Sequence, residues 1–290
     1  MGEALHRGLS RLSERAGRLW RWLSGLSLDV SLGALGLAAL IAEGLGRELL
    51  YPELSALWGS VSLIYCLDHA LDLRRAAQAQ SPRRRLHHEQ RAQLWGLSLL
   101  SLLCALCSLP ALQALSLKLG LSLASLCGLY LALTQRAGLL SSLSKKGVVA
   151  LLYPMGLLLP SLASAELDNA ALPTLSLSLL SLSALCLTLA NLCLFELGER
   201  LRAQRSARAV ETLRGLSLSL SLAPGALALG GRWALSAEEA LACKPLSVIA
   251  LMGLCHLLIT LRLERLSADE SYRRYADSAF LLSWLSLCLT

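Results

Sequence analysis

The sequence predicts an all-α, polytopic membrane protein built as a bundle of nine transmembrane helices. Of the 290 residues, 55% are hydrophobic and only 16% are charged, and the mean hydropathy is +0.56. A soluble domain carries about 25% charged residues. The apolar residues are gathered in repeated runs of roughly 17 or more, the length that crosses a bilayer as a helix.

Nine apolar runs are long enough to be candidate spans. They cover residues 24–43, 52–73, 94–111, 114–134, 147–164, 172–195, 213–230, 245–261 and 275–290. Three prolines fall in the first turns of these runs, where a missing N–H costs nothing: Pro52, Pro173 and Pro245. The prolines therefore agree with the proposed starts.

The alternating Leu and Ser residues of 175–183 have the period of a strand. The apolar run around them continues for over twenty residues, whereas a membrane β-strand needs about 9–11. We therefore expect a helix, in which Ser can hydrogen-bond within its own helix or to a neighbour.

The basic residues fix an orientation. With the N-terminus in the cytoplasm, 23 of the 27 Lys and Arg residues fall in cytoplasmic segments: 1–22, 74–91, 135–146, 199–214 and 262–274. The positive-inside rule then places the C-terminus on the opposite side and agrees with nine crossings. The net charge of +7 is attributed to contact with anionic lipids, and no nucleic-acid partner is expected.

The N-terminal segment differs from the rest of the chain. Over residues 1–23, apolar residues such as Leu5 and Leu9 alternate with Arg7 and Arg11 at helical spacing. This pattern predicts an amphipathic helix that lies in the headgroup layer, followed by a transmembrane domain over 24–290.

Two carboxylates stand at the cytoplasmic end of the second predicted span. Asp68 and Asp72 are four residues apart and share one helix face, where like charges repel unless a cation lies between them. Carboxylate oxygens suit Mg²⁺. The alternative is that both are interfacial residues paired with Arg74 and Arg75.

A second acidic pair stands at the same depth and on the same side. Glu196 and Glu199 share one face at the end of the sixth predicted span, with Asn191 inside the apolar run. Arginines and a basic loop follow each pair, the predicted loops being 74–93 and 197–213. Acids that hold Mg²⁺ and cations that hold phosphate oxygens are what a diphosphate site requires. The apolar bundle would hold a hydrocarbon tail.

This arrangement resembles the UbiA superfamily of intramembrane prenyltransferases, over nearly the whole chain in helix count, orientation and motif placement. The first motif of that family reads N-D-x-x-D-x-x-x-D. Asp68 and Asp72 match its last two acids, whereas Ile64 and Tyr65 stand where Asn and Asp would be.

The second motif of the family is commonly D-x-x-D-x-x-x-D. Glu196 and Glu199 match its first two positions as Glu for Asp, and Ala203 replaces the third acid. Four of the six motif acids are therefore present. The segment from Tyr65 to Arg75 is also similar to a divergent bacterial branch, and the expected location is the bacterial inner (cytoplasmic) membrane.

The resemblance implies a central cavity and Mg²⁺-dependent transfer of a prenyl group from a prenyl diphosphate to an apolar or aromatic acceptor within the membrane. It implies catalytic roles for Asp68 and Asp72. The implied Mg²⁺ ligands are Asp68, Asp72, Glu196 and Glu199. The implied diphosphate-binding residues are Arg74, Lys145, Asn191 and Arg200, and Tyr65 and Tyr153 are expected to line the cavity.

Other interpretations stay open at this point. A terpene cyclase of the same fold would capture the allylic cation with the substrate's own double bonds. A non-catalytic lipid-diphosphate binder or transporter is favoured by the missing acids and opposed by the two retained pairs. Lys145 can equally be a positive-inside residue, and His256 is expected to make an interhelical hydrogen bond rather than to act as a base.

Overall fold

The computed structural model describes residues 17, 20, 22–75, 88–135, 142–167, 173–204, 206–236, 239–268 and 270–289. Within these ranges the description leaves out the side chains of residues 72–75, 135, 142–145 and 164–167. Asp72, Arg74 and Lys145 are therefore placed by their backbone alone. The predicted interfacial helix over 1–23 lies mostly outside the described residues.

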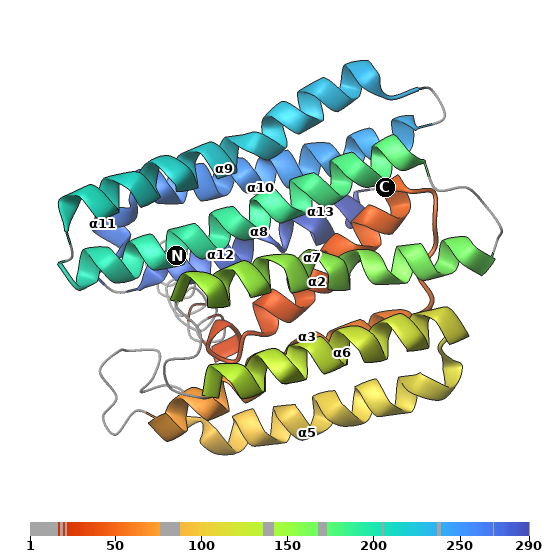
Figure 1. Cartoon of the computed structure of the whole chain (residues 1–290), viewed down its shortest axis with the longest axis horizontal. Helices are drawn as coiled ribbons and strands as arrows, with labels where there is room; N and C mark the ends of the chain where they lie inside the picture. The colour runs from red at the N-terminus through yellow and green to blue at the C-terminus, as the bar shows by residue number, and fades with distance from the viewer. Residues whose placement is uncertain are drawn as a thin grey trace, which may run out of the picture.

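The described part of the chain contains helices and no strand, so the helical interpretation of residues 175–183 is confirmed. The α-helices in Figure 1 are α2 (Leu28–Gly44), α3 (Tyr51–Arg75), α5 (Arg91–Ser108), α6 (Ala114–Gln135), α7 (Ser142–Leu167), α8 (Thr174–Arg202), α9 (Ala207–Ala234), α10 (Cys243–Leu261), α11 (Leu263–Leu266), α12 (Ser271–Ala279) and α13 (Leu282–Cys288). Short 3₁₀ turns occur at Leu109–Ala111 and Ala240–Ala242.

Seven segments of the described chain are long and apolar enough to cross a membrane, and they correspond to α3 and α5–α10. An integral membrane helical bundle is the architecture that they suggest. The first predicted span is α2, whose 17 residues extend roughly 26 Å at the rise of an α-helix. The last predicted span is divided between α12 and α13, with a turn at Phe280 and Leu281.

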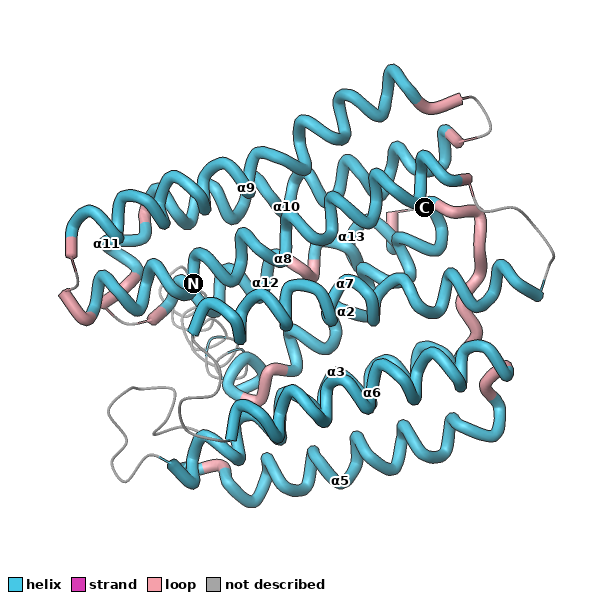
Figure 2. Tube along the Cα trace, in the orientation of Figure 1, coloured by secondary structure: helices cyan, strands magenta, loops and turns pink. Residues whose placement is uncertain are grey.

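The predicted basic loop over 197–213 is wrong in extent. The α8 helix continues to Arg202 and α9 begins at Ala207, so most of that segment is helical and the connection is short (Figure 2). Glu, Arg, Leu and Ala are good helix formers, and they extend both helices beyond their apolar runs. As a result, Glu196 and Glu199 lie within a continuous helix.

The core forms around α2, which packs against α3, α7, α10, α12 and α13. Leu37, Leu40 and Ile41 of α2 are fully buried. Gly33 permits the close approach of the final segment, because a Cβ at this position would lie 2.5 Å from the Phe280 Cβ. The Trp284 Nε1 donates to the Leu32 carbonyl at 2.7 Å and ties α13 to α2.

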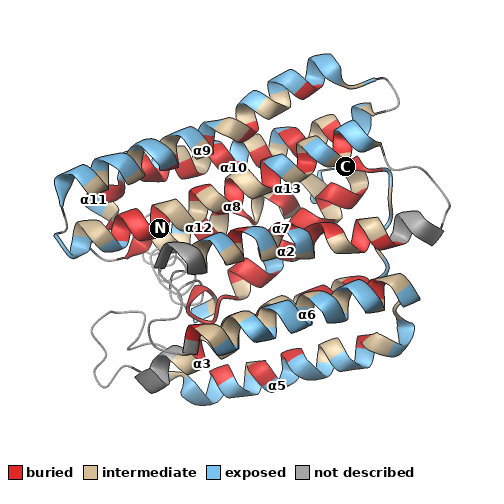
Figure 3. Ribbon diagram, in the orientation of Figure 1, coloured by how far each residue is buried: buried red, intermediate tan, exposed pale blue. Residues whose placement is uncertain are grey.

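The outer faces of the bundle are apolar. Exposed residues dominate α5 and α6 in Figure 3, and they include Leu99 and Leu103 of α5 and Leu121 and Leu129 of α6. Large leucines exposed along whole helices suit contact with lipid tails. The structure therefore combines an apolar exterior with a core centred on α2.

Candidate functional site

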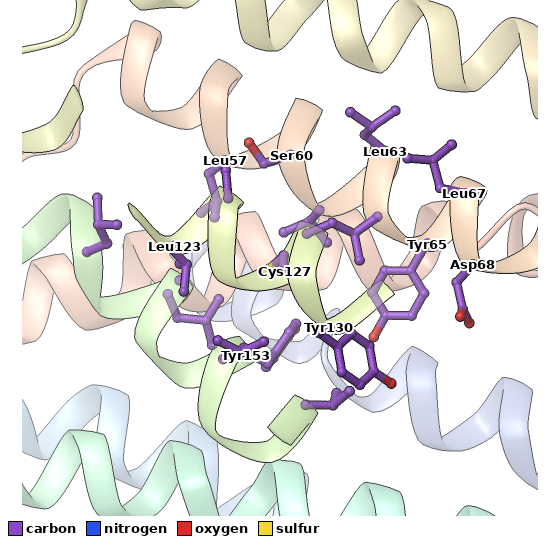
Figure 4. Close-up of a pocket in the computed structure, with 18 of the residues that line it drawn as sticks. Leu57, Ser60, Leu63, Tyr65, Leu67, Asp68, Leu123, Cys127, Tyr130 and Tyr153 are labelled. Atoms are coloured by element: carbon purple, nitrogen blue, oxygen red, sulfur yellow. The ribbon is translucent and has the colours of Figure 1, made fainter. Parts of the chain in front are cut away.

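A cavity of about 600 Å³ lies between α3, α6, α7 and α8 and reaches α12. Its walls are mainly apolar, with Leu57 of α3, Leu123 of α6 and Leu157 of α7 among the lining residues. Tyr65 and Asp68 of α3 and Tyr130 of α6 are among the lining residues that Figure 4 shows. The cavity volume is typical of a pocket for a small molecule.

Charged and polar residues from four helices line one end of the cavity. They are Asp68 of α3, Lys146 of α7, Asn191 of α8, and Arg273 and Asp277 of α12. These helices are far apart in sequence, so the fold brings the groups together. An anionic headgroup could bind here, because Lys146 and Arg273 both supply positive charge.

The far end of the cavity is marked by Glu53, which lies 15 residues before Asp68 on α3. At the rise of an α-helix this separates the two acids by about 22 Å. Glu53 is buried and accepts hydrogen bonds from the Leu50 N–H at 3.1 Å and the Ser116 hydroxyl at 3.3 Å. These two donors satisfy the Glu53 carboxylate, which caps the first turn of α3.

Glu196 lies just beyond the charged end and holds two cations. Its Oε2 accepts from the Lys146 Nζ, and its Oε1 accepts from the Arg200 Nε at 2.7 Å. All three side chains are less than one-third exposed, at 12% for Glu196, 26% for Lys146 and 31% for Arg200. Glu196 therefore positions Lys146 at the cavity wall.

Arg273 is held on several sides. Its Nη2 donates to Glu199 Oε1 at 2.5 Å and its Nε donates to the Tyr272 hydroxyl at 3.2 Å. The guanidinium also lies over the ring of Phe195, 5.2 Å from the centroid, which is a cation–π geometry. A guanidinium stays protonated at all ordinary pH values. Arg273 is thus a fixed, permanent positive charge.

The predicted site residues separate into three groups. Asp68, Asn191, Tyr65 and Tyr153 line the cavity. Glu196, Glu199 and Arg200 do not line it and form ion pairs beside it. The predicted roles of Asp72, Arg74 and Lys145 concern side chains outside the described set.

Sequence reasoning missed Arg273 and Asp277. Arg273 falls in the basic segment 262–274 that sets the predicted orientation, and the sequence prediction assigns Asp277 no role in the site. The available signal was their spacing of four residues, which places Arg273 and Asp277 on one face of α12. Lys146, the neighbour of the predicted Lys145, is the lysine whose described side chain reaches the cavity.

The predicted Mg²⁺ site needs carboxylates that are gathered in space. Among the described residues, no group of three or more His, Cys, Asp or Glu side chains is arranged to hold a metal ion. Both oxygens of Glu196 already accept from cations, and Glu199 accepts from Arg273. Asp68 and Asp277 are the carboxylates at the charged end of the cavity, and the backbone of Asp72 lies one turn beyond Asp68 on α3. Carboxylate oxygens suit Mg²⁺.

The expected interhelical hydrogen bond of His256 is confirmed. His256 is fully buried in α10, and its Nε2 lies 3.3 Å from the side-chain amide of Asn191 on α8. Asn191 therefore has a structural partner on one side and the cavity on the other.

Searches against protein-family models and curated proteins return no match for this chain. The UbiA resemblance therefore stays a prediction from motif placement and topology.

Proposed function

We propose that this protein binds a prenyl diphosphate in the cavity and transfers its prenyl group to an apolar or aromatic acceptor within the membrane. The observation that carries the proposal is the shape and charge of one cavity. Lys146 and Arg273 lie at one end, and leucines line the space beyond them. A diphosphate with a hydrocarbon tail matches both parts.

In this proposal the two cations bind the diphosphate. The bond between the prenyl carbon and oxygen breaks, and its electron pair leaves with the diphosphate. Lys146 and Arg273 stabilise the negative charge that develops, while Glu196 and Glu199 hold them in position. Asp68 and Asp72 would hold Mg²⁺, which supplies further positive charge to the leaving group.

The apolar part of the cavity protects the allylic cation. Leu57, Leu123 and Leu157 exclude water, which would otherwise attack the cation. A π-bond of the acceptor supplies the electron pair for the new carbon–carbon bond, and the acceptor then loses a proton. A terpene cyclase would use the same residues, with the second π-bond coming from the prenyl chain itself.

The proposal includes nine crossings of a bacterial inner membrane, with the N-terminus in the cytoplasm and the C-terminus on the opposite side. In this topology α2 is the first span, because other helices enclose it, and α12 and α13 together form the last span. The asymmetry of Lys and Arg supports the orientation. The charged end of the cavity then faces the cytoplasm, where water-soluble diphosphate is released.

The second candidate is a non-catalytic binder of lipid diphosphates. One observation favours it: Glu196 and Glu199 are engaged by Lys146, Arg200 and Arg273 rather than gathered around a metal position. Such a site binds a diphosphate through cations alone and does not need Mg²⁺.

Protein purified in lipid nanodiscs tests these alternatives. Farnesyl diphosphate is titrated with Mg²⁺ and with EDTA, and released diphosphate is measured with a lipid extract as the acceptor source. A prenyltransferase releases diphosphate and loses at least about a hundredfold in rate in Asp68→Asn. Tight binding in EDTA, together with no release of diphosphate in Mg²⁺, supports the binder, and no binding under either condition rejects both.

The matched control is Glu43→Gln. Glu43 on α2 pairs with Lys244 on α10 at 2.7 Å, and neither residue lines the cavity. The control removes one carboxylate from the bundle, as Asp68→Asn does. It is expected to leave farnesyl diphosphate binding unchanged.

A further inference from the structure

Each ring nitrogen of His256 lies within hydrogen-bond distance of a polar partner. Its Nδ1 lies 2.9 Å from the Met252 carbonyl oxygen, and its Nε2 lies 3.3 Å from Oδ1 of Asn191. Both partners are acceptors, so both ring nitrogens would need to carry a proton. The ring would then be an imidazolium.

An imidazolium is unfavourable at this position. His256 is fully buried, and among the described contacts its neighbours are a backbone carbonyl, an amide and the ring of Phe280, with a centroid distance of 5.7 Å. None of these is a carboxylate. A buried charge without a counter-ion costs far more than a neutral imidazole with one proton.

The position of the one proton decides the orientation of Asn191. The Met252 carbonyl can only accept, so the proton is on Nδ1 and Nε2 must itself accept. The group facing Nε2 is then the Asn191 NH₂. Oxygen and nitrogen of an amide exchange by a half turn, and their assignment follows from the hydrogen-bond network.

This orientation leaves the Asn191 carbonyl oxygen on the side away from His256. Asn191 lines the cavity, as does Tyr153 of α7. The Tyr153 hydroxyl is buried and has no hydrogen-bond partner among the described residues. Phe280 packs edge-on against Tyr153, at 6.2 Å between centroids, as well as against His256. Asn191 and Tyr153 therefore line the same cavity and are linked through the contacts of His256 and Phe280.

We propose that His256 is a positioning residue that orients the Asn191 amide so that its carbonyl oxygen, together with the Tyr153 hydroxyl, binds the hydroxyl group of an apolar ligand. A hydroxyl group donates to Asn191 and accepts from Tyr153, so it satisfies both. Buried polar groups in proteins are nearly always paired, which makes a bound ligand the natural partner of Tyr153. This inference deepens the proposed function and rests on it in taking the cavity to hold an apolar ligand.

Farnesol and farnesyl methyl ether test the proposal. Both oxygens accept from Tyr153, but only the alcohol can donate to Asn191. Dissociation constants are measured in phosphatidylcholine nanodiscs, and binding to empty nanodiscs is subtracted. We expect the wild-type protein to bind the alcohol about tenfold more tightly than the ether, the effect of one hydrogen bond in a dry site.

The variants separate positioning from packing. Asn191→Leu should reduce the alcohol-to-ether ratio to about one, and His256→Phe should reduce it about threefold because the amide is no longer held. His256→Gln should restore the ratio, because the Gln carbonyl can accept from the Asn191 NH₂. Tyr153→Phe and the apolar control Leu123→Ala should weaken both probes alike and leave the ratio unchanged.

Three results would overturn the proposal. They are a wild-type ratio near one, a ratio that survives in Asn191→Leu, and equal ratios in His256→Phe and His256→Gln. If His256→Phe does not fold, Asn191→Leu decides the outcome. Farnesyl diphosphate is titrated into the same samples: binding of the diphosphate with a wild-type alcohol-to-ether ratio of one rejects only this inference, and the reverse result rejects only the proposed function.

Discussion

Glu196→Gln removes one negative charge and leaves the size of the side chain nearly unchanged. In the structure Glu196 accepts from Lys146 and Arg200, and Lys146 lines the cavity. A bound diphosphate and Glu196 therefore compete for the same ammonium group. We expect Glu196→Gln to increase the affinity for farnesyl diphosphate in the absence of Mg²⁺.

The magnitude follows from one charged hydrogen bond. Such a bond contributes about 1.5–3 kcal/mol, and the Lys146 side chain is 26% exposed, so water reduces the contribution to about 1–2 kcal/mol. The expected decrease in Kd is roughly five- to thirtyfold. The same change should lower the free energy of unfolding by about 1–3 kcal/mol, because Lys146 and Arg200 lose their shared carboxylate.

The assay is a titration of farnesyl diphosphate into nanodiscs in EDTA, with Glu43→Gln as the control. An affinity that is unchanged or lower in EDTA would refute the competition between Glu196 and the diphosphate. An affinity that falls only when Mg²⁺ is present would instead assign Glu196 the metal-binding role that its motif position predicts.

Two further predictions concern Arg273 and the contact between α2 and the final segment. Arg273→Met should weaken farnesyl diphosphate binding about tenfold at both pH 7 and pH 10 but leave farnesol binding unchanged, because a guanidinium stays protonated over this range; titrations of the wild type and the variant at the two pH values check this. Gly33→Ala should lower the free energy of unfolding by about 1–3 kcal/mol, because the new Cβ meets the Phe280 Cβ at 2.5 Å. Gly120→Ala is its control, since a Cβ there meets nothing within 4 Å, and equal unfolding free energies for the two variants would contradict the packing described.

The predicted site residues that line the cavity share one property. Asp68, Asn191, Tyr65 and Tyr153 are polar groups inside apolar runs, where they are costly unless a cavity or a partner receives them. Their position in the sequence is therefore informative by itself. All four line the same cavity.

The residues and boundaries that sequence reasoning missed lie where polar character is ordinary. Arg273 and Asp277 belong to the short polar helix α12. A charged residue beside a membrane is attributed to membrane orientation unless its neighbours in the fold are known. The extension of α8 to Arg202 was missed for a related reason, because hydropathy does not register a helix that continues into polar sequence. The pairing of Glu196 with Lys146 depends on packing between α7 and α8, which sequence spacing does not contain.

The account of the cavity is tested most directly by mapping where the hydrocarbon tail binds. A farnesyl diphosphate analogue with a photoreactive diazirine at the tail end is crosslinked in nanodiscs, and the labelled peptides are identified by mass spectrometry. The account predicts labelling of α6 and α7 around Leu123, Cys127 and Leu157, and its loss with excess farnesyl diphosphate. Labelling confined to the outer leucines of α5, unaffected by the competitor, would contradict it.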